Sequence, residues 1–415
     1  MNAALRPQRP TDLRIRTLSN GLRAVVVQTA VEDLVAVDVW VQAGSAMEQP
    51  SERGAAHLLE HMLFKGTKSR GPGEIDAAVE SYGGVLNAGT SRDYAHFFAT
   101  VEAGALKHLL GILADALQNP RFDEGETELE RQVILDELAR RLNVDALRRE
   151  DIAFQTAYSG SASALPVLAT SNDILKLRPE ALRRFHERCY RPQNCVVVAV
   201  GDLLPEQALA TIQDVFGSWN RNVSATAPSA PVPPEPAWKP GRFGPVKVAA
   251  IGAMPSQEIL VYRTPPAKSA GDLIHAELVS AIVANACQAE VRTSGSIDCE
   301  AVHGCNGGVL YIAADEKLAA RVFARAEKTL DRLSDSGPTH GELVEARRLV
   351  AGRYLYEAET VGGLARQMGY WTLLGDAELP VAVEQKMATV APSAVRGYVR
   401  RYMRPSSSER ETTAQ

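Results

Sequence analysis

The sequence predicts an α+β protein built from two halves. Strand-like and helical segments follow one another in groups, and a proline-rich stretch then divides the chain. Six of the 23 prolines fall between Pro228 and Pro240, a composition typical of a semi-rigid, extended linker. We therefore expect an N-terminal α+β domain over residues 11–220, a linker over 221–243, and a C-terminal α+β domain over 244–404.

The first half begins with strands and continues with helices. The pair Asn20-Gly21 stands between two apolar runs, which is a hairpin signal. Apolar residues at helical spacing predict the helices that follow. In chain order, the expected strands are 13–18, 22–28, 34–41, 85–101 and 195–200, and the expected helices are 54–64, 72–82, 106–117, 124–142 and 174–189.

The second half repeats this order of elements in a shorter form. A strand is expected at 258–262, a helix at 274–289, further strands between 297 and 313, and helices from 317 onward. The repetition predicts an internal duplication.

Length and charge exclude several classes of protein. A chain of 415 residues, 45% hydrophobic and 23% charged, has the composition of a globular protein with a large core. Its formal charge of −5 offers no net positive field for phosphate backbones, so no nucleic-acid partner is expected. The longest apolar run, Cys195 to Val200, is far shorter than the ~18 residues of a membrane-spanning helix. No membrane span is therefore expected.

The main chemical signal is His57-Leu58-Leu59-Glu60-His61, within an expected helix. Residues four apart share a helix face, so the two imidazoles can converge on one Zn²⁺. Glu60 borders the same face, where a carboxylate can take a proton from water. A catalytic zinc ion usually has three protein ligands, so another Asp, Glu or His is needed.

The candidate for that ligand lies on the expected helix 124–142. Glu130 and Glu137 are seven residues apart, which is two helical turns, so they project from one face. One of them can bind zinc, and the other can orient a histidine by a hydrogen bond. The alternative is that both are solvated carboxylates on a charged helix. A purely structural pair is likewise the alternative for His57 and His61.

Three segments together resemble the inverted-zincin metallopeptidases, the family of the mitochondrial processing peptidase and insulin-degrading enzyme. They are residues 54–67, 83–90 and 130–137. Glu137 follows His61 by 76 residues, which also matches that family. The resemblance covers nearly the whole chain and is closest to the zinc-bearing subunit of the bacterial, processing-peptidase-like branch.

The resemblance implies one zinc ion per chain, bound by His57, His61 and Glu137. It implies that Glu60 is the general base and that Glu130 supports the site from a second layer. It also implies two homologous α/β halves, each a mainly antiparallel sheet packed against helices.

The segment 83–90 is expected to hold the substrate. A glycine-edged strand can accept an extended peptide by β-augmentation. In the family, the corresponding edge resembles a substrate-holding strand. We therefore expect Gly84, Asn87 and Ala88 to contact the peptide. The alternative is an ordinary sheet strand after a helix.

The second half departs from the family pattern. Single-chain active members carry an Arg followed seven residues later by a Tyr, whereas here Arg292 is followed at that spacing by Cys299. Tyr311 lies too far along the chain to replace the missing Tyr. The resemblance therefore predicts a heterodimer with a homologous subunit that lacks the zinc motif and supplies the Arg and the Tyr.

The cysteine and histidine side chains outside the motif are not expected to bind a metal. Cys299, His303 and Cys305 match no standard ligand spacing and predict a buried cluster. The histidines outside the motif, His96 among them, have no partner at ligand spacing and are expected to be structural or surface residues.

The leading interpretation is a zinc endopeptidase subunit that hydrolyses peptides or unfolded polypeptides. The alternative is a non-catalytic scaffold subunit of a larger assembly, but a scaffold has no reason to keep both motif histidines, Glu60 and Glu137 together. The compartment stays open. The first residues carry no secretory signal, which favours the cytoplasm, whereas exported bacterial relatives favour the periplasm if a signal segment was removed.

Overall fold

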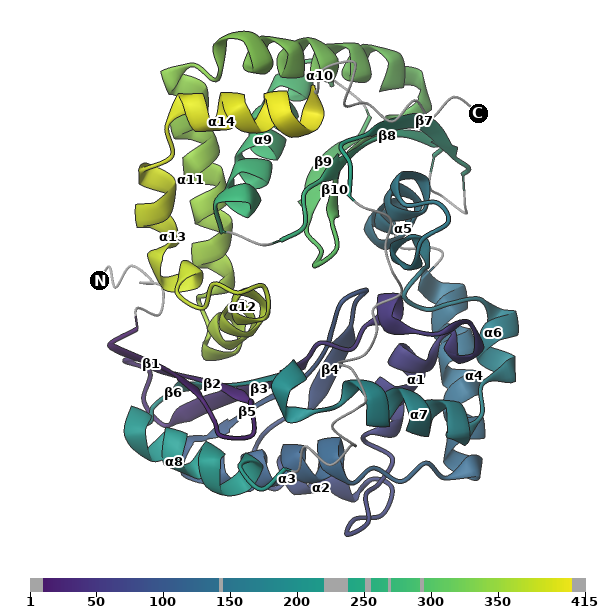
Figure 1. The fold of residues 1–415 in the computed structure, drawn as a ribbon, viewed down its shortest axis with the longest axis vertical. Helices are drawn as coiled ribbons and strands as arrows, with labels where there is room; N and C mark the ends of the chain where they lie inside the picture. Colours follow the sequence, from purple (N-terminus) through teal and green to yellow (C-terminus); the bar gives the residue numbers. More distant parts are fainter. Residues whose placement is uncertain are drawn as a thin grey trace. The chain divides into compact units, whose positions relative to one another are not determined.

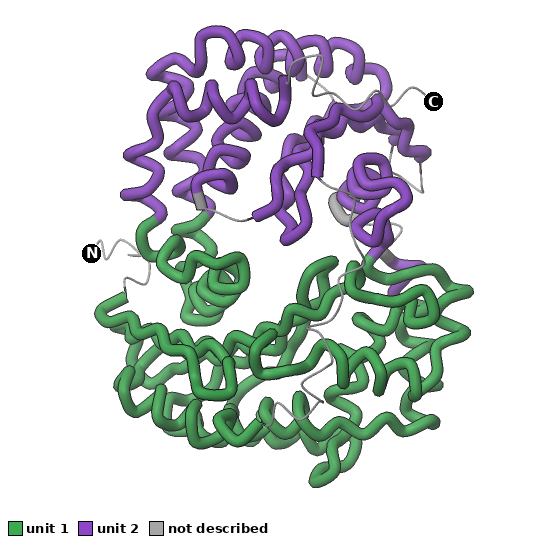
Figure 2. Tube along the Cα trace, viewed as in Figure 1, with its two compact units in different colours: residues 1–136, 167–233, 354–382 green, residues 137–166, 234–353, 383–415 purple. Residues whose placement is uncertain are grey.

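The chain forms two compact units, each assembled from three stretches of sequence (Figures 1 and 2). This computed structural model describes residues 10–141, 145–219, 238–250, 255–267, 270–291 and 295–404. Unit 1 comprises residues 1–136, 167–233 and 354–382, and unit 2 comprises residues 137–166, 234–353 and 383–415. Each unit holds one sheet packed against helices, which confirms the predicted fold class.

The sheet of unit 1 has six strands in the order β1-β2-β6-β3-β5-β4. Only the pairing of β2 with β6 is parallel. The predicted hairpin joins β1 to β2, and its turn contains Gly21 at φ 91°. The strands are β1 Asp12–Thr17, β2 Arg23–Gln28, β3 Leu34–Val41, β4 Asn87–Thr90, β5 Ala95–Glu102 and β6 Cys195–Gly201.

One face of this sheet packs against a layer of helices. Alternate residues of β5, from Ala95 to Val101, are buried in that layer, as the two-residue period of a strand requires. The helices of unit 1 that precede the proline-rich stretch are α1 Ala55–Met62, α2 Glu74–Glu80, α3 Leu106–Gln118, α4 Glu124–Arg141, α6 Ser171–Lys176, α7 Pro179–Cys189 and α8 Pro205–Phe216. Helix α4 belongs to this unit as far as residue 136.

The other face of the sheet is covered by α12 (Val361–Leu373), a helix from the second half of the sequence. Strand β6 is therefore buried on both faces, which explains its unbroken apolar run. The helix lies so close that a Cβ at Gly369 would stand 2.1 Å from Nε1 of Trp40. Glycine at position 369 thus allows α12 to pack on β3.

Unit 2 has a four-stranded antiparallel sheet in the order β7-β8-β10-β9. Helix α5 (Asp145–Ala157), from the first half of the sequence, packs Phe154 on one face of the sheet, beside Val261 and Val309. The remaining elements are β7 Arg242–Val248, β8 Gln257–Thr264, α9 Ala270–Gln288, β9 Ile297–Val302, β10 Gly308–Asp315, α10 Glu316–Ser336, α11 His340–Glu357, α13 Leu379–Ala388 and α14 Pro392–Tyr398, of which α11 and α13 cross the unit boundaries.

The contacts thus divide the chain differently from the sequence-based domains 11–220 and 244–404. Residues 137–166 belong to unit 2 and residues 354–382 to unit 1, because α5 and α12 each bury their apolar side on the sheet of the other half. Most of the predicted linker lies outside the described residues. Its last two positions, 242 and 243, are already part of β7.

Other differences are local. The strand predicted over 85–101 is a hairpin of β4 and β5. The helix predicted over 174–189 is two helices, because Pro179 starts α7 and disfavours helical geometry in the residue before it. The elements α5, α8 and β7 were not predicted.

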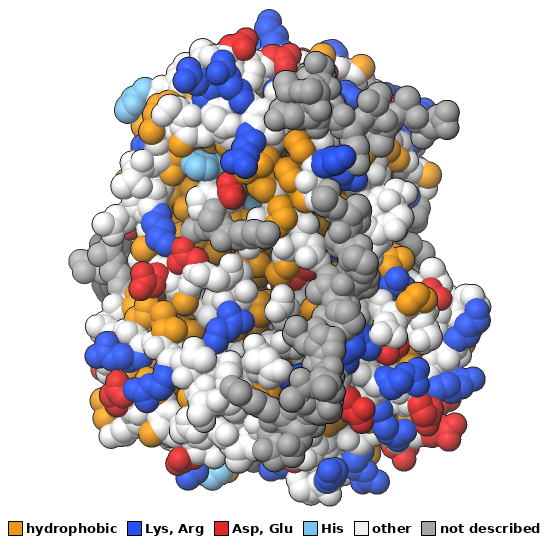
Figure 3. Space-filling model, viewed as in Figure 1, with side chains coloured by type: hydrophobic (Ala, Val, Ile, Leu, Met, Phe, Trp, Pro, Cys, Tyr) orange, Lys and Arg blue, Asp and Glu red, His pale blue; other side chains and the backbone are white. Residues whose placement is uncertain are grey.

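The described surface carries charges of both signs. On the face in Figure 3, Lys and Arg side chains stand among Asp and Glu side chains. Among the described helices, none combines the length and hydropathy needed to cross a bilayer.

Candidate active site

Helix α1 carries the motif and is held firmly at its start. Its N-cap, Gly54, has φ 87°, which favours glycine, and an added Cβ would stand 2.4 Å from Cδ1 of Ile174. The buried carboxyl group of Glu48 accepts the backbone N–H of Gly54 at 2.9 Å and that of Ala56 at 2.8 Å. Burial raises the pKa of Glu48 to about 8, against the effect of these two hydrogen bonds. Glu48 thus fixes the first turn of the helix.

The predicted ligands come together. One ligand atom from each of His57, His61 and Glu137 lies within 4.8 Å of the other two. The two imidazole centroids are 4.8 Å apart. His57 is buried, whereas His61 and Glu137 are half-buried. The group is therefore partly exposed to solvent. Two imidazoles and a carboxylate are a donor set that zinc accepts.

Glu130 is buried and contacts one member of this group, His61. Its Oε2 is 2.9 Å from Nδ1 of His61, and its Oε1 is 2.9 Å from Nζ of Lys65. The His61 hydrogen bond, together with Lys65, lowers the pKa of Glu130 although burial opposes this. An ionised Glu130 favours the His61 tautomer with its proton on Nδ1, which leaves the Nε2 lone pair for a metal.

Glu60 is oriented by the edge strand of the sheet. The hydroxyl group of Thr90, the last residue of β4, donates to Oε2 of Glu60 at 2.5 Å. Glu60 is half-buried and shares the helix face of His57 and His61. One carboxylate thus stands beside the three candidate ligands without belonging to the group that can hold the metal.

Strand β4 is the last strand of its sheet, so in the part of the chain that the structure describes no further strand pairs with its outer edge. Asn87 is exposed, and its Oδ1 accepts the N–H of Ala88 at 2.8 Å. Gly84 lies before the strand and is buried, where a Cβ would stand 2.6 Å from Cγ1 of Val101. Close packing on β5 therefore accounts for this glycine. Peptide contact by Gly84, Asn87 and Ala88 stays a prediction.

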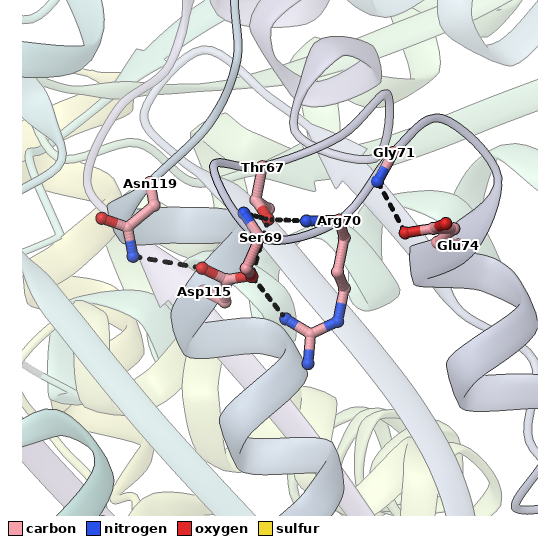
Figure 4. Close-up of polar contacts among 7 residues, drawn as sticks. All are labelled: Thr67, Ser69, Arg70, Gly71, Glu74, Asp115 and Asn119. Carbon is pink, nitrogen blue, oxygen red and sulfur yellow. Dashed lines mark hydrogen bonds and ion pairs between the residues drawn. The ribbon is translucent and has the colours of Figure 1, made fainter.

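The loop that follows α1 is tied to α3 by Asp115 (Figure 4). The Asp115 carboxylate accepts hydrogen bonds from the hydroxyl of Thr67 at 2.7 Å and that of Ser69 at 2.6 Å. It also contacts the guanidinium of Arg70 and the amide of Asn119. Burial alone would raise the pKa of Asp115, but these hydrogen bonds together lower it below its ordinary value.

Asp115→Asn is expected to lower the free energy of unfolding by ~1.5 to 3 kcal/mol at pH 7, the usual range for hydrogen bonds to a charged group. A depressed pKa means that the ionised group stabilises the fold above pH ~4, and that this contribution is lost as the pH falls through the folded-state pKa. Urea unfolding at pH 7 and at pH 3 measures the difference from the wild type. Asp214→Asn, at an exposed position on α8, is the control. A loss of equal size at both pH values would contradict the assignment.

Three residues bear on the missing Arg and Tyr pair: Arg292, Cys299 and Tyr311. Arg292 lies outside the described residues. Cys299 is on β9, its thiol faces the backbone oxygen of Ser280 at 3.5 Å, and burial raises its pKa. Tyr311 donates its hydroxyl to Glu300 at 2.7 Å.

Three residues of this site were missed from the sequence. Lys65 has a sequence signal, since it stands four residues after His61, at the spacing of one helical turn. Glu48 and Thr90 have none, because their contacts depend on how the loop before α1 and the strand β4 pack on the helix.

Comparison with known families shows which family the chain belongs to. The model of the insulinase family (peptidase family M16) matches residues 23–171, and the model of the M16 inactive domain matches residues 176–350. The chain belongs to the M16 family. The motif, Glu130 and Glu137 all fall in the part matched by the first model.

Individual proteins are similar to this chain. An uncharacterized zinc protease of Streptomyces coelicolor is 27% identical over 95% of this chain and 89% of its own length. The beta subunit of the mitochondrial processing peptidase of Dictyostelium discoideum is 33% identical over 50% of this chain and 44% of its own length. The crystal structure of a protease from Helicobacter pylori has the same fold, with a TM-score of 0.82 over 96% of this chain and 97% of that one, at 22% identity.

Proposed function

We propose that this chain is the zinc-bearing subunit of an endopeptidase that acts on peptides or unfolded polypeptides. The observation that supports it most is the convergence of His57, His61 and Glu137 within 4.8 Å, beside Glu60. The zinc proteases and the processing-peptidase subunit among its relatives support the same reaction class.

The donor set fits zinc better than it fits a hard cation. Two of its three donors are imidazoles, which suit zinc, whereas calcium and magnesium select oxygen ligands. Glu130 gives His61 the carboxylate partner that metal-binding histidines usually have. Zinc held there would acidify water and polarise the carbonyl of a peptide bond.

Glu60 performs the proton transfers in this proposal. Its carboxylate accepts a proton from the attacking water and then delivers it to the amine nitrogen that leaves. Thr90 holds one oxygen of this carboxylate in place. A peptide added to the edge of β4 would lie beside the same residue, because Thr90 belongs to that strand.

A homologous partner subunit completes the active site in this proposal. The chain lacks the Arg and Tyr spacing of single-chain active members, and donors to the developing oxyanion are a major source of rate. The match of residues 176–350 to the M16 inactive domain supports a second half without a metal centre of its own.

Zinc content tests the ligand set directly. The wild-type chain is expected to hold one zinc ion, and His61→Ala and Glu137→Gln are each expected to lose most of it, because two remaining ligands bind zinc weakly. Elemental analysis after dialysis measures the ratio of zinc to protein. Glu124→Gln, exposed on the same helix as Glu137, is the control. Full occupancy in both ligand variants would overturn the assignment.

A peptidase assay separates the enzyme from the scaffold alternative. With the partner present, the wild-type chain is expected to cleave unfolded polypeptide, and a zinc chelator is expected to abolish the cleavage. Zinc binding without any hydrolysis would favour the scaffold.

A further inference from the structure

A stack of rings lies on the face of the unit 1 sheet that α12 partly covers. The rings of Trp40 and His96 are 4.3 Å apart and tilted by 28°, and those of His96 and Phe98 are 5.0 Å apart and tilted by 17°. The imidazole thus stacks with two aromatic rings. Only 11% of the His96 side chain is exposed.

Asp38 fixes the imidazole ring of His96 at one edge. Each of its carboxylate oxygens is 3.2 Å from Nδ1 of His96, and the residue is 1% exposed. Burial raises the pKa of Asp38, while the hydrogen bond with His96 acts in the opposite direction. The orientation of His96 is therefore set by three neighbours, as for a histidine that must present its other nitrogen at a defined point.

Nε2 of His96 lies over the edge strand β4. Gly89 of β4 is the register partner of His96 on β5, and a Cβ at Gly89 would stand 2.9 Å from Nε2 of His96. The imidazole therefore occupies the space that any larger residue at position 89 would need. Neighbouring strands lie about 4.8 Å apart, so Nε2 is only about one strand spacing from a peptide added to the edge of β4.

An exposed cation stands on the same face. Arg366 of α12 is exposed, and its guanidinium lies 5.5 Å from the centroid of the Phe98 ring. The nearby anion, Asp38, is buried at the opposite edge of the imidazole and already engaged by Nδ1. Two donors on this face thus remain as candidates for a ligand: the exposed guanidinium of Arg366, which also acts on Asp38, and Nε2 of His96.

We propose that His96 and Arg366 recognise an acidic side chain, Glu or Asp, of the bound peptide. In an added strand, alternate side chains point to this face, and the one beside Gly89 meets no side chain of β4. Its carboxylate can accept hydrogen bonds from Nε2 of His96 and from the guanidinium. The inference rests on the proposed function for the identity of its ligand as a substrate.

Binding of matched peptides tests this site independently of catalysis. Glu60→Gln is used as the background, because it prevents cleavage. Fluorescence anisotropy compares extended peptides that differ only in Glu, Gln or Leu at one position, scanned along the peptide, with the partner subunit included. At one position, Glu is expected to bind about tenfold more tightly than Gln or Leu, the value of one hydrogen bond to a charged group.

His96→Phe keeps a stacked ring and removes both ring nitrogens, including the Nδ1 that contacts Asp38. Arg366→Gln removes the cation and leaves the His96–Asp38 pair intact. Each is expected to abolish the preference for Glu and to leave the affinity for the Leu peptide unchanged. His108→Phe, exposed on α3, and Arg148→Gln, on α5 in unit 2, are the matched controls.

Equal affinity for the three peptides at every position would overturn this inference, and so would a preference for Glu that survives both variants. Absence of binding by any peptide would overturn it as well. The proposed peptidase function is judged separately, by hydrolysis of unfolded polypeptide by the chain with Glu60 intact. Hydrolysis without a preference for Glu would therefore reject the acidic subsite alone.

Discussion

Replacing Glu60 with Gln is expected to lower kcat for peptide hydrolysis by a factor of about 10² to 10⁴, the usual contribution of general acid–base catalysis. The amide has the size of the carboxylate, and its oxygen can still accept the hydroxyl of Thr90. It cannot take a proton from water at neutral pH. Zinc content is expected to stay at the wild-type level, because the candidate ligands are other residues.

Two measurements on one preparation check this result. Initial rates at saturating peptide give kcat, and elemental analysis gives the zinc content. Glu80→Gln, exposed on α2, is the matched control. A near-normal kcat would reject Glu60 as the base. Loss of zinc would instead identify it as a ligand, and the set of His57, His61 and Glu137 would need revision.

The part of the site that could be predicted from residues alone is the part that one helix determines. A spacing of four residues places His57 and His61 on one face, and Glu60 falls on it as well. The position of Glu137 beside them depends on how α4 packs on α1, which no local pattern contains. The spacing of Glu130 and Glu137 left open which one binds zinc, and the family resemblance was needed to separate them.

The spacing of residues along the chain could not predict contacts between distant segments. Thr90 meets Glu60 only because β4 packs on α1, and His96 meets Gly89 only through the register of β4 and β5. Spacing along the chain therefore left His96 without a partner, although Asp38 lies opposite Phe98 on the neighbouring strand β3. Asp38, the one polar residue inside the otherwise apolar strand 34–41, was the local sign of this pair.

The division of the chain into two units also depends on contacts between distant segments. The apolar run of β6 predicts a strand buried on both faces, but it does not identify the helix on the second face. That helix is α12, more than 150 residues later in the sequence, and α5 of the first half covers the sheet of unit 2 in turn. A division at the proline-rich stretch therefore could not give the units that the contacts define.

The purified chain alone is expected to be nearly inactive, and addition of a homologous subunit that carries the Arg and Tyr pair is expected to raise kcat/KM by about 10² to 10³. Removal of one oxyanion donor costs enzymes this much, so a site without such donors keeps its metal and loses its rate. Two described side chains of this region are engaged by neighbouring carboxylates. Asp298 is bound to Arg149 at 3.0 Å, and the hydroxyl of Tyr311 is bound to Glu300.

Reconstitution with the natural partner measures this effect. The homologue is sought in the neighbouring reading frame by the absence of His-x-x-Glu-His and the presence of the Arg and Tyr. Peptide hydrolysis is followed for each subunit alone and for the mixture, and the partner with its Arg replaced by Ala is the control for assembly without donors. That control is expected to bind this chain and restore little activity. Full activity of this chain alone would mean that donors within the same chain stabilise the oxyanion, and the heterodimer would then be unnecessary for catalysis.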